Sequence, residues 1–288
     1  MIRVMRLEYP IRILCRVLKV SRSRYYEWAK MKVSKRAQEN ERLKIAIAAE
    51  HRASGETYGP LRLKDELKEK GFKVSVGRII RLRKEMSIRC RQKKKYRATT
   101  DSNHGHPVYE NLLGECKPAT GPNQIWVSDI TYIWTDEGWL YLAGILDAFQ
   151  SELVGYSFSD RIKKEIVINA LVRAVNRKRP GKKVLHHSDR GSQYCSREYR
   201  RKLKRYGMIG SMSRKGNCYD NAMMESFWAI LKTEFIYGRR FRTRAEAIAL
   251  ITSFIETKYN RQRRHSRLGN LSPAAFLQNY FKNLSQAA

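Results

Sequence analysis

The stretch Ile125-Trp126-Val127-Ser128-Asp129-Ile130-Thr131-Tyr132-Ile133-Trp134 decides the fold class of this chain. β-Branched and aromatic residues dominate it, which is typical of a β-strand. Successive side chains of a strand point to opposite faces, so Asp129 shares one face with Val127 and Ile133. An unpaired carboxylate among apolar side chains is costly, and aspartate has a low β-propensity. The position therefore predicts that Asp129 is a functional acid.

The elements that follow this strand predict an α/β domain. Two more strands, 138–147 and 153–158, are spaced as hairpins. After them the pattern predicts, in order, a helix over 164–177, a strand over 184–188, a helix over 196–206, a strand over 209–212 and a helix over 221–237. Three antiparallel strands followed by alternating helices and strands indicate a mixed sheet with flanking helices.

Two further acidic residues complete a candidate metal site. Asp189 follows the strand 184–188, and α/β proteins favour sites at the C-terminal ends of strands. Its alternative is an ordinary turn or helix-cap aspartate. Glu225 lies just inside the helix 221–237, where an exposed glutamate is commonplace and proves nothing alone. Together, two carboxylates on strands and one on a helix offer the hard oxygen ligands that Mg²⁺ or Mn²⁺ prefers.

The charge of the chain indicates a polyanionic partner. Its 288 residues hold 59 Lys and Arg against 27 Asp and Glu, a formal charge of +32. No apolar stretch approaches the roughly 20 residues of a membrane-spanning helix, so nucleic acid is favoured over lipid. No signal peptide is evident, and we expect a cytoplasmic protein. The five cysteines lack a Cys-x-x-Cys pair, which argues against a disulfide framework or a thiolate zinc site.

The first 100 residues hold much of the excess positive charge and predict two helical units. Helices are expected over 11–18 and 22–30, with Ser21 as N-cap between them. A second pair begins at Tyr58 and at Ser75, with an apolar seam at Leu61, Leu63, Leu67, Val76, Ile79, Ile80 and Leu82. The outward residues of its second helix are Arg78, Arg81, Arg83 and Lys84. We expect these helices to contact DNA, the alternative being a solvated basic helix in a small bundle.

A basic and polar segment separates these helices from the strands. Lys93, Lys94 and Lys95 precede a stretch rich in turn formers, and such a linker either follows a phosphate backbone or is simply solvated. The predicted organisation is a helix-turn-helix-like segment over 1–50, a second helix-turn-helix domain over 51–98, a linker over 99–119, a catalytic core over 120–240 and a C-terminal helical tail over 241–288.

The motifs around the three acids resemble those of a known family. The matching stretches are Pro122–Ile133, His187–Tyr194, Ser213–Glu234 with Asn217, Asp220 and Asn221, and the tail residues Tyr259, Asn260, Arg263, Arg264, His265 and Leu271-Ser272-Pro273. Between Asp189 and Glu225 lie 35 residues. In these features the sequence resembles the OrfB-type DDE transposases of the bacterial insertion sequence 3 family, relatives of retroviral integrases.

The resemblance implies an RNase H-like five-stranded core and a DNA cleavage and strand-transfer activity. Asp129, Asp189 and Glu225 would hold two Mg²⁺ ions, with Mn²⁺ as a substitute, for in-line phosphoryl transfer. Lys232 is seven residues beyond Glu225 on one helix face, and a basic residue there contacts terminal DNA in similar transposases. Its alternative is a solvated lysine paired with Glu225 or Glu234.

Several other residues receive supporting roles by the same resemblance. His187, Asn217 and Asn221 are expected to support the acids, and Arg263 and Arg264 to contact DNA. For His187, a purely structural role is the alternative to orienting Asp189. Trp126, Tyr132 and Trp228 are interpreted as packing aromatics rather than base-stacking platforms.

The expected partners follow from the proposed chemistry. They are double-stranded DNA, as terminal inverted repeats and as target, and a second copy of the chain, because joining two ends requires at least a dimer. Proteins of this family often act as the downstream part of a frameshift fusion with an upstream OrfA-type product. The sequence leaves open whether this chain acts alone, with such a partner or as part of such a fusion. Association with the bacterial nucleoid is expected. The alternative function is a DNA-binding regulator of transposition with an inactive core.

Overall fold

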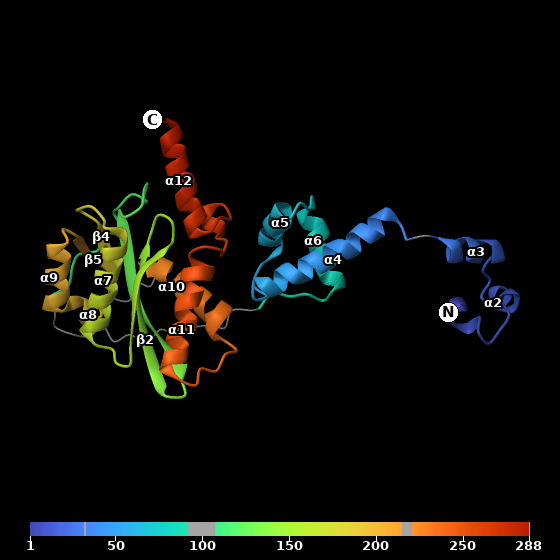
Figure 1. Ribbon diagram of the computed structural model, residues 1–288, viewed down its shortest axis with the longest axis horizontal. Coiled ribbons are helices and arrows are strands. Elements are labelled where there is room, and N and C mark those ends of the chain that lie inside the picture. Colours follow the sequence, from blue (N-terminus) through green and yellow to red (C-terminus); the bar gives the residue numbers. More distant parts are fainter. Residues whose placement is uncertain (32, 92–106, 215–220, 288) are drawn as a thin grey trace.

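The N-terminal part of the chain forms three short helices. The computed structural model describes residues 1–31, 33–91, 107–214 and 221–287 (Figure 1). Helices α1 (Ile2–Met5), α2 (Ile11–Val17) and α3 (Arg22–Lys30) form a small group set apart from the rest of the chain. The predicted helices over 11–18 and 22–30 are therefore present. Ser21 stands at the N-cap of α3, although its side chain makes no capping hydrogen bond.

A second helical unit contains α4 (Lys35–Ala53), α5 (Pro60–Glu69) and α6 (Val76–Glu85). One apolar cluster joins all three helices through Leu43, Ile47, Tyr58, Leu63, Leu67, Ile79 and Leu82. The sequence analysis did not predict α4, and the predicted boundary between residues 50 and 51 divides this helix. Ser75 caps α6, because its Oγ accepts a hydrogen bond from the Arg78 backbone N at 3.3 Å.

Two residues predicted for the apolar seam of this unit point to solvent instead. Leu61 is 63% exposed and Ile80 is 52% exposed. Ile80 directly follows the buried Ile79, and Leu61 stands two positions before the buried Leu63. A helix turns by about 100° per residue, so only part of its circumference meets the core. That part of the prediction was wrong.

The core of the molecule is a mixed five-stranded sheet, as predicted. Its strands are β1 (Ile125–Thr135), β2 (Gly138–Asp147), β3 (Leu153–Ser159), β4 (Leu185–Ser188) and β5 (Ile209–Met212), in the order β3-β2-β1-β4-β5. β1, β2 and β3 pair antiparallel, whereas β4 is parallel to both β1 and β5. The C-terminal end of β4 therefore lies beside the middle of β1.

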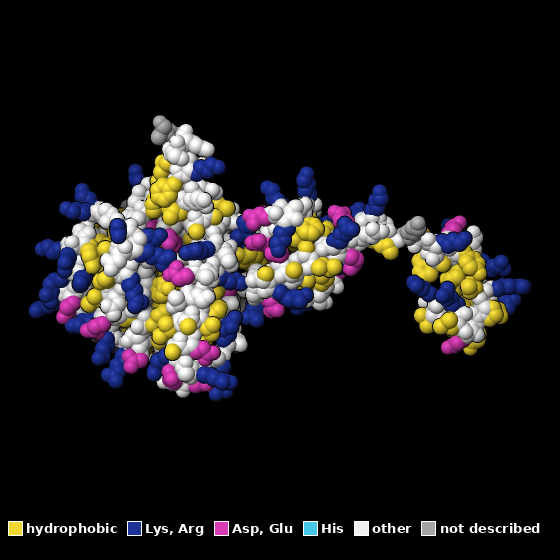
Figure 2. Space-filling view, in the orientation of Figure 1, with side chains coloured by type: hydrophobic (Ala, Val, Ile, Leu, Met, Phe, Trp, Pro, Cys, Tyr) yellow, Lys and Arg dark blue, Asp and Glu magenta, His cyan; other side chains and the backbone are white. Residues whose placement is uncertain are grey.

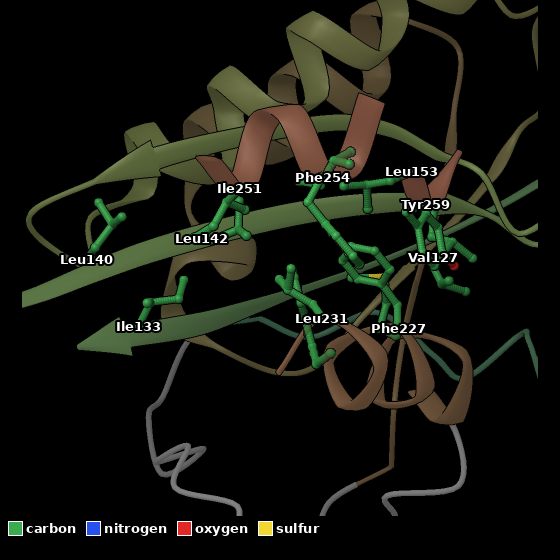
Figure 3. Packing of buried hydrophobic residues seen from close by; sticks show 14 of the residues in the cluster. Val127, Ile133, Leu140, Leu142, Leu153, Phe227, Leu231, Ile251, Phe254 and Tyr259 are labelled. Atoms are coloured by element: carbon green, nitrogen blue, oxygen red, sulfur yellow. The ribbon is translucent and has the colours of Figure 1, made fainter. Parts of the chain in front are cut away.

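Helices cover both faces of this sheet (Figure 1). On one face lie α7 (Lys164–Lys178), α8 (Ser192–Cys195) and α9 (Arg197–Arg205), which pack around Trp126 of β1. On the other lie α10 (Ala222–Leu231), the π-helix η2 (Lys232–Ile236), α11 (Arg244–Ser253) and the π-helix η3 (Phe254–Tyr259). Figure 3 shows Phe227, Leu231 and Phe254 of these elements facing Val127 and Leu142. The alternation predicted for β1 thus separates two apolar cores.

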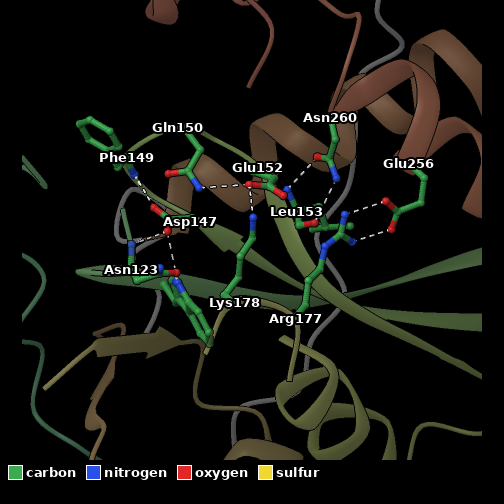
Figure 4. A network of polar contacts seen from close by, with 11 residues as sticks. Asn123, Asp147, Phe149, Gln150, Glu152, Leu153, Arg177, Lys178, Glu256 and Asn260 are labelled. Atoms are coloured by element: carbon green, nitrogen blue, oxygen red, sulfur yellow. Dashed lines mark hydrogen bonds and ion pairs between the residues drawn. The ribbon is translucent and has the colours of Figure 1, made fainter. Parts of the chain in front are cut away.

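The C-terminal segment belongs to this core rather than to a separate tail. Phe241, Ile251 and Phe254 are buried in the same cluster as Val127, so the predicted boundary between residues 240 and 241 falls within one packed unit. Polar contacts add to this packing (Figure 4). The Asn260 side chain accepts a hydrogen bond from Leu153 N at 3.0 Å and donates one to Leu153 O at 3.2 Å. The chain continues through the 3₁₀-helix η4 (Ser266–Leu268) into α12 (Pro273–Ala287).

Two other expectations concern the linker and the cysteines. The second half of the predicted linker lies along β5, where Leu112 N donates to Ser211 Oγ at 3.0 Å.

Cys15, Cys90, Cys116 and Cys195 are free thiols, while Cys218 lies outside the described residues. Throughout the described ranges, every helix is too short or too polar to cross a lipid bilayer.

Candidate active site

Asp129 lies in the middle of β1, on the face that α10 covers. Its Oδ1 accepts a hydrogen bond from Ile130 N at 2.8 Å, and its Oδ2 accepts one from Trp228 Nε1 at 2.9 Å. Gly144 stands opposite Asp129 on β2, and a Cβ at Gly144 would lie 2.9 Å from Trp228 Cη2. The missing side chain therefore allows α10 to approach the sheet and bring the Trp228 indole to the carboxylate.

Asp189 follows β4 directly and lies close enough to Asp129 to affect its ionisation. Its Oδ1 accepts a hydrogen bond from Gly191 N at 2.9 Å, which fixes the carboxylate at the start of the turn into α8. Burial is the main cause that raises the pKa of Asp129 to about 7, and the negative charge of Asp189 is the second. A carboxylate in the middle of β1 and another just after the end of the parallel strand β4 thus form a site where negative charge accumulates.

Glu225 occupies the first turn of α10 and is exposed to solvent. Its charge contributes less than that of Asp189 to the raised pKa of Asp129. Partial burial raises the pKa of Glu225 itself. The helix start is fastened to β1 next to Asp129, since Asn221 Nδ2 donates to Ser128 O at 3.1 Å. The sequence-predicted acids therefore face one region, with Asp129 and Asp189 more closely associated than Glu225.

The donor set suits a hard divalent cation. Carboxylate oxygens are the ligands that Mg²⁺ and Mn²⁺ prefer, and the raised pKa of Asp129 reflects negative charge that a cation would neutralise. In addition, the buried Oδ1 of Asn221 has no hydrogen-bond partner among the residues described. Within the same ranges, no three His, Cys, Asp or Glu side chains converge closely enough to enclose an ion. The arrangement fits ions that are bound partly by substrate or water, as is usual for Mg²⁺.

Lys232 lies one position beyond α10, at the start of η2, and is only 7% exposed. Its Nζ stands 5.1 Å from the centre of the Tyr132 ring, which is a cation–π geometry. Burial lowers the pKa of Lys232, and the nearby charge of Asp129 counteracts this. The ammonium group of Lys232 is therefore held beside the acids by the Tyr132 ring of β1.

His187 links β4 to the parallel edge strand β5 rather than standing in the site itself. It is fully buried, with Nδ1 2.9 Å from Ser211 Oγ and Nε2 3.1 Å from Ser213 Oγ. These contacts hold β4 against β5 two residues before Asp189. Asn221 acts on the other side by tying α10 to β1. Asn217 lies outside the described residues.

The basic residues predicted on α6 divide into two groups. Arg81 and Lys84 are exposed, as expected of DNA-contacting side chains. Arg78 is instead engaged within the domain, with Nη2 donating to Glu39 Oε2 at 2.9 Å and to Asn40 Oδ1 at 2.8 Å. Arg83 is buried and donates to Cys90 Sγ at 3.1 Å, so the prediction that it faces outward was wrong. A position two after Arg81 on a helix lies about 200° away, against the core.

Arg263 and Arg264 hold parts of the protein together instead of facing outward. Arg263 donates two hydrogen bonds to Glu234, at 2.6 and 2.8 Å. Arg264 donates to Glu66 Oε1 at 2.7 Å and lies 2.6 Å from Glu69 Oε1, joining the C-terminal segment to α5. Both are buried and bound to carboxylates, so neither faces outward, and their contact with DNA stays a prediction. Lys93, Lys94 and Lys95 lie outside the described residues, while Figure 2 shows other Lys and Arg side chains over all three visible parts.

Two residues of the site were missed by sequence reasoning. Trp228, interpreted as a packing aromatic, also donates to Asp129. It stands three positions after Glu225, so both lie on one helix face, and this spacing was the available signal. Gly144 had no signal of its own, because its role depends on the register that places it opposite Asp129.

Nearly the whole chain is similar in sequence to known proteins. Two models described as "Integrase core domain" match residues 119–218 and 206–273, and one described as "HTH-like domain" matches residues 38–96. The uncharacterized 31 kDa protein of insertion element IS600 from Shigella sonnei is 54% identical over 267 residues, covering 93% of this chain and 98% of that protein. Transposase InsF for insertion sequence IS3A from Escherichia coli (strain K12) is 41% identical over 271 residues, 93% of this chain and 94% of its own. The solved catalytic core domain of HTLV-2 integrase, in complex with magnesium, is 16% identical with a TM-score of 0.44, covering 55% of this chain and 98% of that one.

Proposed function

The chain belongs to the transposase family of insertion sequence IS3, and we propose that Asp129, Asp189 and Glu225 form its catalytic site for cutting and joining DNA strands. The observation that carries this proposal is the accumulation of negative charge at Asp129, whose pKa is raised to about 7 by burial and by Asp189. A protein does not keep two such carboxylates together for stability, since like charges repel. They are explained if the site binds cations.

Each residue then has a defined task. When bound, two Mg²⁺ ions, or Mn²⁺ in their place, supply the Lewis acidity that activates the attacking oxygen and stabilises the leaving oxygen at a phosphodiester. Asp129, Asp189 and Glu225 are the residues that would hold these ions. Trp228 keeps Asp129 oriented through its hydrogen bond to Oδ2.

The DNA is held by positive charge near these acids. Lys232 is close enough to Asp129 for the two charges to interact, so a phosphate positioned at the acids also meets the ammonium group. A water or a DNA 3′-hydroxyl attacks the phosphate in line and the opposite oxygen leaves, without a covalent bond to the protein. The proposed substrates are the terminal inverted repeats of the element and a target duplex.

Assembly is proposed on the same grounds. Joining two element ends in one reaction requires two active sites, so at least a dimer is expected on DNA. Whether an upstream OrfA-type product joins the assembly, as a partner or by frameshift fusion, is a further proposal that the flanking DNA can test. An overlapping upstream frame would support it.

Strand cleavage by acid-to-amide variants tests the proposal. The full chain is incubated with labelled element ends and Mg²⁺ or Mn²⁺, and products are resolved on a denaturing gel. Asp129→Asn or Glu225→Gln should reduce cleavage on the order of a thousandfold or more, because a ligand of the reacting phosphate's metal is lost. Glu165→Gln is a matched control, since Glu165 is also an exposed acid in the first turn of a helix, α7. Full activity in Glu225→Gln would remove Glu225 from the site.

A further inference from the structure

Three aromatic side chains form a continuous row at the outer end of the β1–β2 hairpin. The Tyr132 and Trp139 rings lie 5.0 Å apart between centres, at an interplanar angle of 87°. Trp139 and Trp134 face each other across the two strands, with ring centres 4.9 Å apart. We call Tyr132, Trp139 and Trp134 the aromatic track. All three rings are in edge-to-face contact, so each fixes the orientation of the next.

The aromatic track is exposed at its far end and reaches the candidate site at its near end. Trp134 is 57% exposed and Trp139 is 43% exposed, which is unusual for the largest apolar side chain. At the other end, the Lys232 ammonium lies 5.1 Å from the Tyr132 ring centre and feels the charge of Asp129. The row therefore begins at Lys232, on the sheet face opposite to Asp129, and runs outward to solvent.

Positive side chains accompany the outer part of the track. The backbone N of Asp136, in the hairpin turn, donates to Phe241 O at 2.9 Å, so the loop before α11 lies beside the turn. At the first residue of α11, Arg244 Nε donates to Trp139 O at 3.0 Å. Arg240, 84% exposed, lies 3.0 Å from Asp136 Oδ2. The outer end of the track is thus bordered by two guanidinium groups and by the carboxylates of Asp136 and Glu137, and the guanidinium groups can contact the phosphates of a strand that lies on the rings.

We propose that the aromatic track binds unpaired bases of the DNA strand that passes through the candidate active site. Exposed aromatic rings bordered by cations are what sequence-tolerant single-strand binding uses, because each base offers a flat face for stacking and each phosphate a negative charge. Base pairs inside a duplex keep their faces covered by neighbouring pairs. Only a frayed or cleaved end presents them. The inference rests on the proposed function, since it assigns the strand to DNA handled by this site.

DNA binding by the full chain in EDTA tests the inference separately from catalysis. The probes are a labelled single-stranded oligonucleotide, a duplex end with a single-stranded tail, and a blunt duplex. Trp134→Ala/Trp139→Ala should weaken binding to the first two by about tenfold or more and leave the blunt duplex within about twofold, because only stacking is removed. Phe281→Ala is the control, since Phe281 is equally exposed at 53% on α12, at the opposite end of the core from the hairpin (Figure 1). It should leave all three affinities unchanged.

Other results would overturn the inference. Unchanged affinity for both single-stranded probes in the double variant excludes stacking on the track. An equal loss on all three probes indicates a general electrostatic or folding effect, which thermal unfolding and circular dichroism would reveal. Loss of a dimer in sedimentation, with single-strand affinity intact, would make the track a contact between protein copies. The binding assay contains EDTA, so its result does not depend on cleavage. If Asp129→Asn still cleaves DNA in the separate assay with Mg²⁺, that result counts against the proposed function and not against the aromatic track.

Discussion

Two groups of charged side chains lie at α10 and η2, one made of like charges and the other of opposite charges. In the first, Asp129 and Asp189 place like charges together, and the pKa of Asp129 rises to about 7 as a consequence of burial and of that neighbour. In the second, Arg263 and Glu234 place opposite charges together through two hydrogen bonds, with side chains 4% and 7% exposed. Partly buried charges thus repel each other in the first region, and more deeply buried charges attract each other in the second.

The difference separates a candidate site from a structural contact. A buried pair of opposite charges satisfies its own hydrogen bonds and leaves little to offer a ligand. A pair of like charges is satisfied only when something of opposite charge arrives, so it is kept for binding or catalysis. Arg264 follows the first rule, because Glu66 and Glu69 of α5 neutralise it and fasten the second helical unit to the C-terminal segment. Basic residues in a basic protein are therefore not interchangeable as DNA contacts.

The largest effect is expected from breaking the opposite-charge pair. Arg263→Met leaves Glu234 buried without its partner, and this should lower the free energy of unfolding by about 3–5 kcal/mol. Urea denaturation followed by circular dichroism measures it. Arg261→Met, two residues earlier and exposed, is the matched control and should change stability by less than about 0.5 kcal/mol. If Arg263→Met is as stable as wild type but binds DNA more weakly, Arg263 is a DNA contact after all.

A smaller effect of opposite sign is expected at the like-charge pair. A carboxyl group with a raised pKa in the folded state stabilises the fold at low pH, and this contribution is lost as pH rises from about 4 to 7. For Asp129, which is partly exposed, we expect about 2 kcal/mol over this range in EDTA. Asp129→Asn should remove that pH dependence and unfold at a higher temperature than wild type at pH 7.5.

Two controls isolate this effect. His186 and His265 have lowered pKa values from burial, so they stabilise the fold as pH rises, and the difference between wild type and Asp129→Asn cancels their contribution. Adding Mg²⁺ at pH 7.5 should raise the melting temperature of wild type and not that of the variant. If wild type and Asp129→Asn have the same stability across this pH range, the folded state does not raise the pKa of Asp129.

The sequence was sufficient to predict the sheet and the order of its elements. Alternation in residues 125–134 placed Asp129 correctly, and the strands β2 and β5 were predicted with their observed bounds. It was not sufficient to predict α4, whose apolar residues Leu43 and Ile47 form too narrow a face to stand out among charged neighbours. The domain boundaries failed for a related reason, since contacts across 100 residues, such as Asn260 with Leu153, have no local signature.

For the candidate site, the sequence proposes the three acids but gives little signal for their surroundings. Spacing and resemblance identified Asp189 and Glu225, whereas the support from Trp228 and Gly144 depends on how α10 lies on β2. The DNA contacts were least predictable. Positive charge alone did not distinguish the exposed Lys84 from the buried Arg83, because both sit in one basic run and only the packing of α6 separates them.

The neighbouring pair Arg83 and Lys84 offers the finest test of the rule drawn from the two charged regions. If exposed cations of α6 meet phosphate, Lys84→Ala should reduce duplex affinity only modestly, and the slope of log affinity against log salt should fall by about 0.9, the value for one phosphate contact. Arg83→Met should leave that slope unchanged and instead lower the melting temperature of the helical unit, since its guanidinium donates to Cys90 inside the protein. Fluorescence anisotropy titrations between about 50 and 200 mM salt measure the slopes, because the affinity of a protein for DNA changes strongly with salt over this range. An equal change of slope in both variants would mean that α6 rotates on DNA to expose Arg83, and that burial in the free protein does not decide which cations bind.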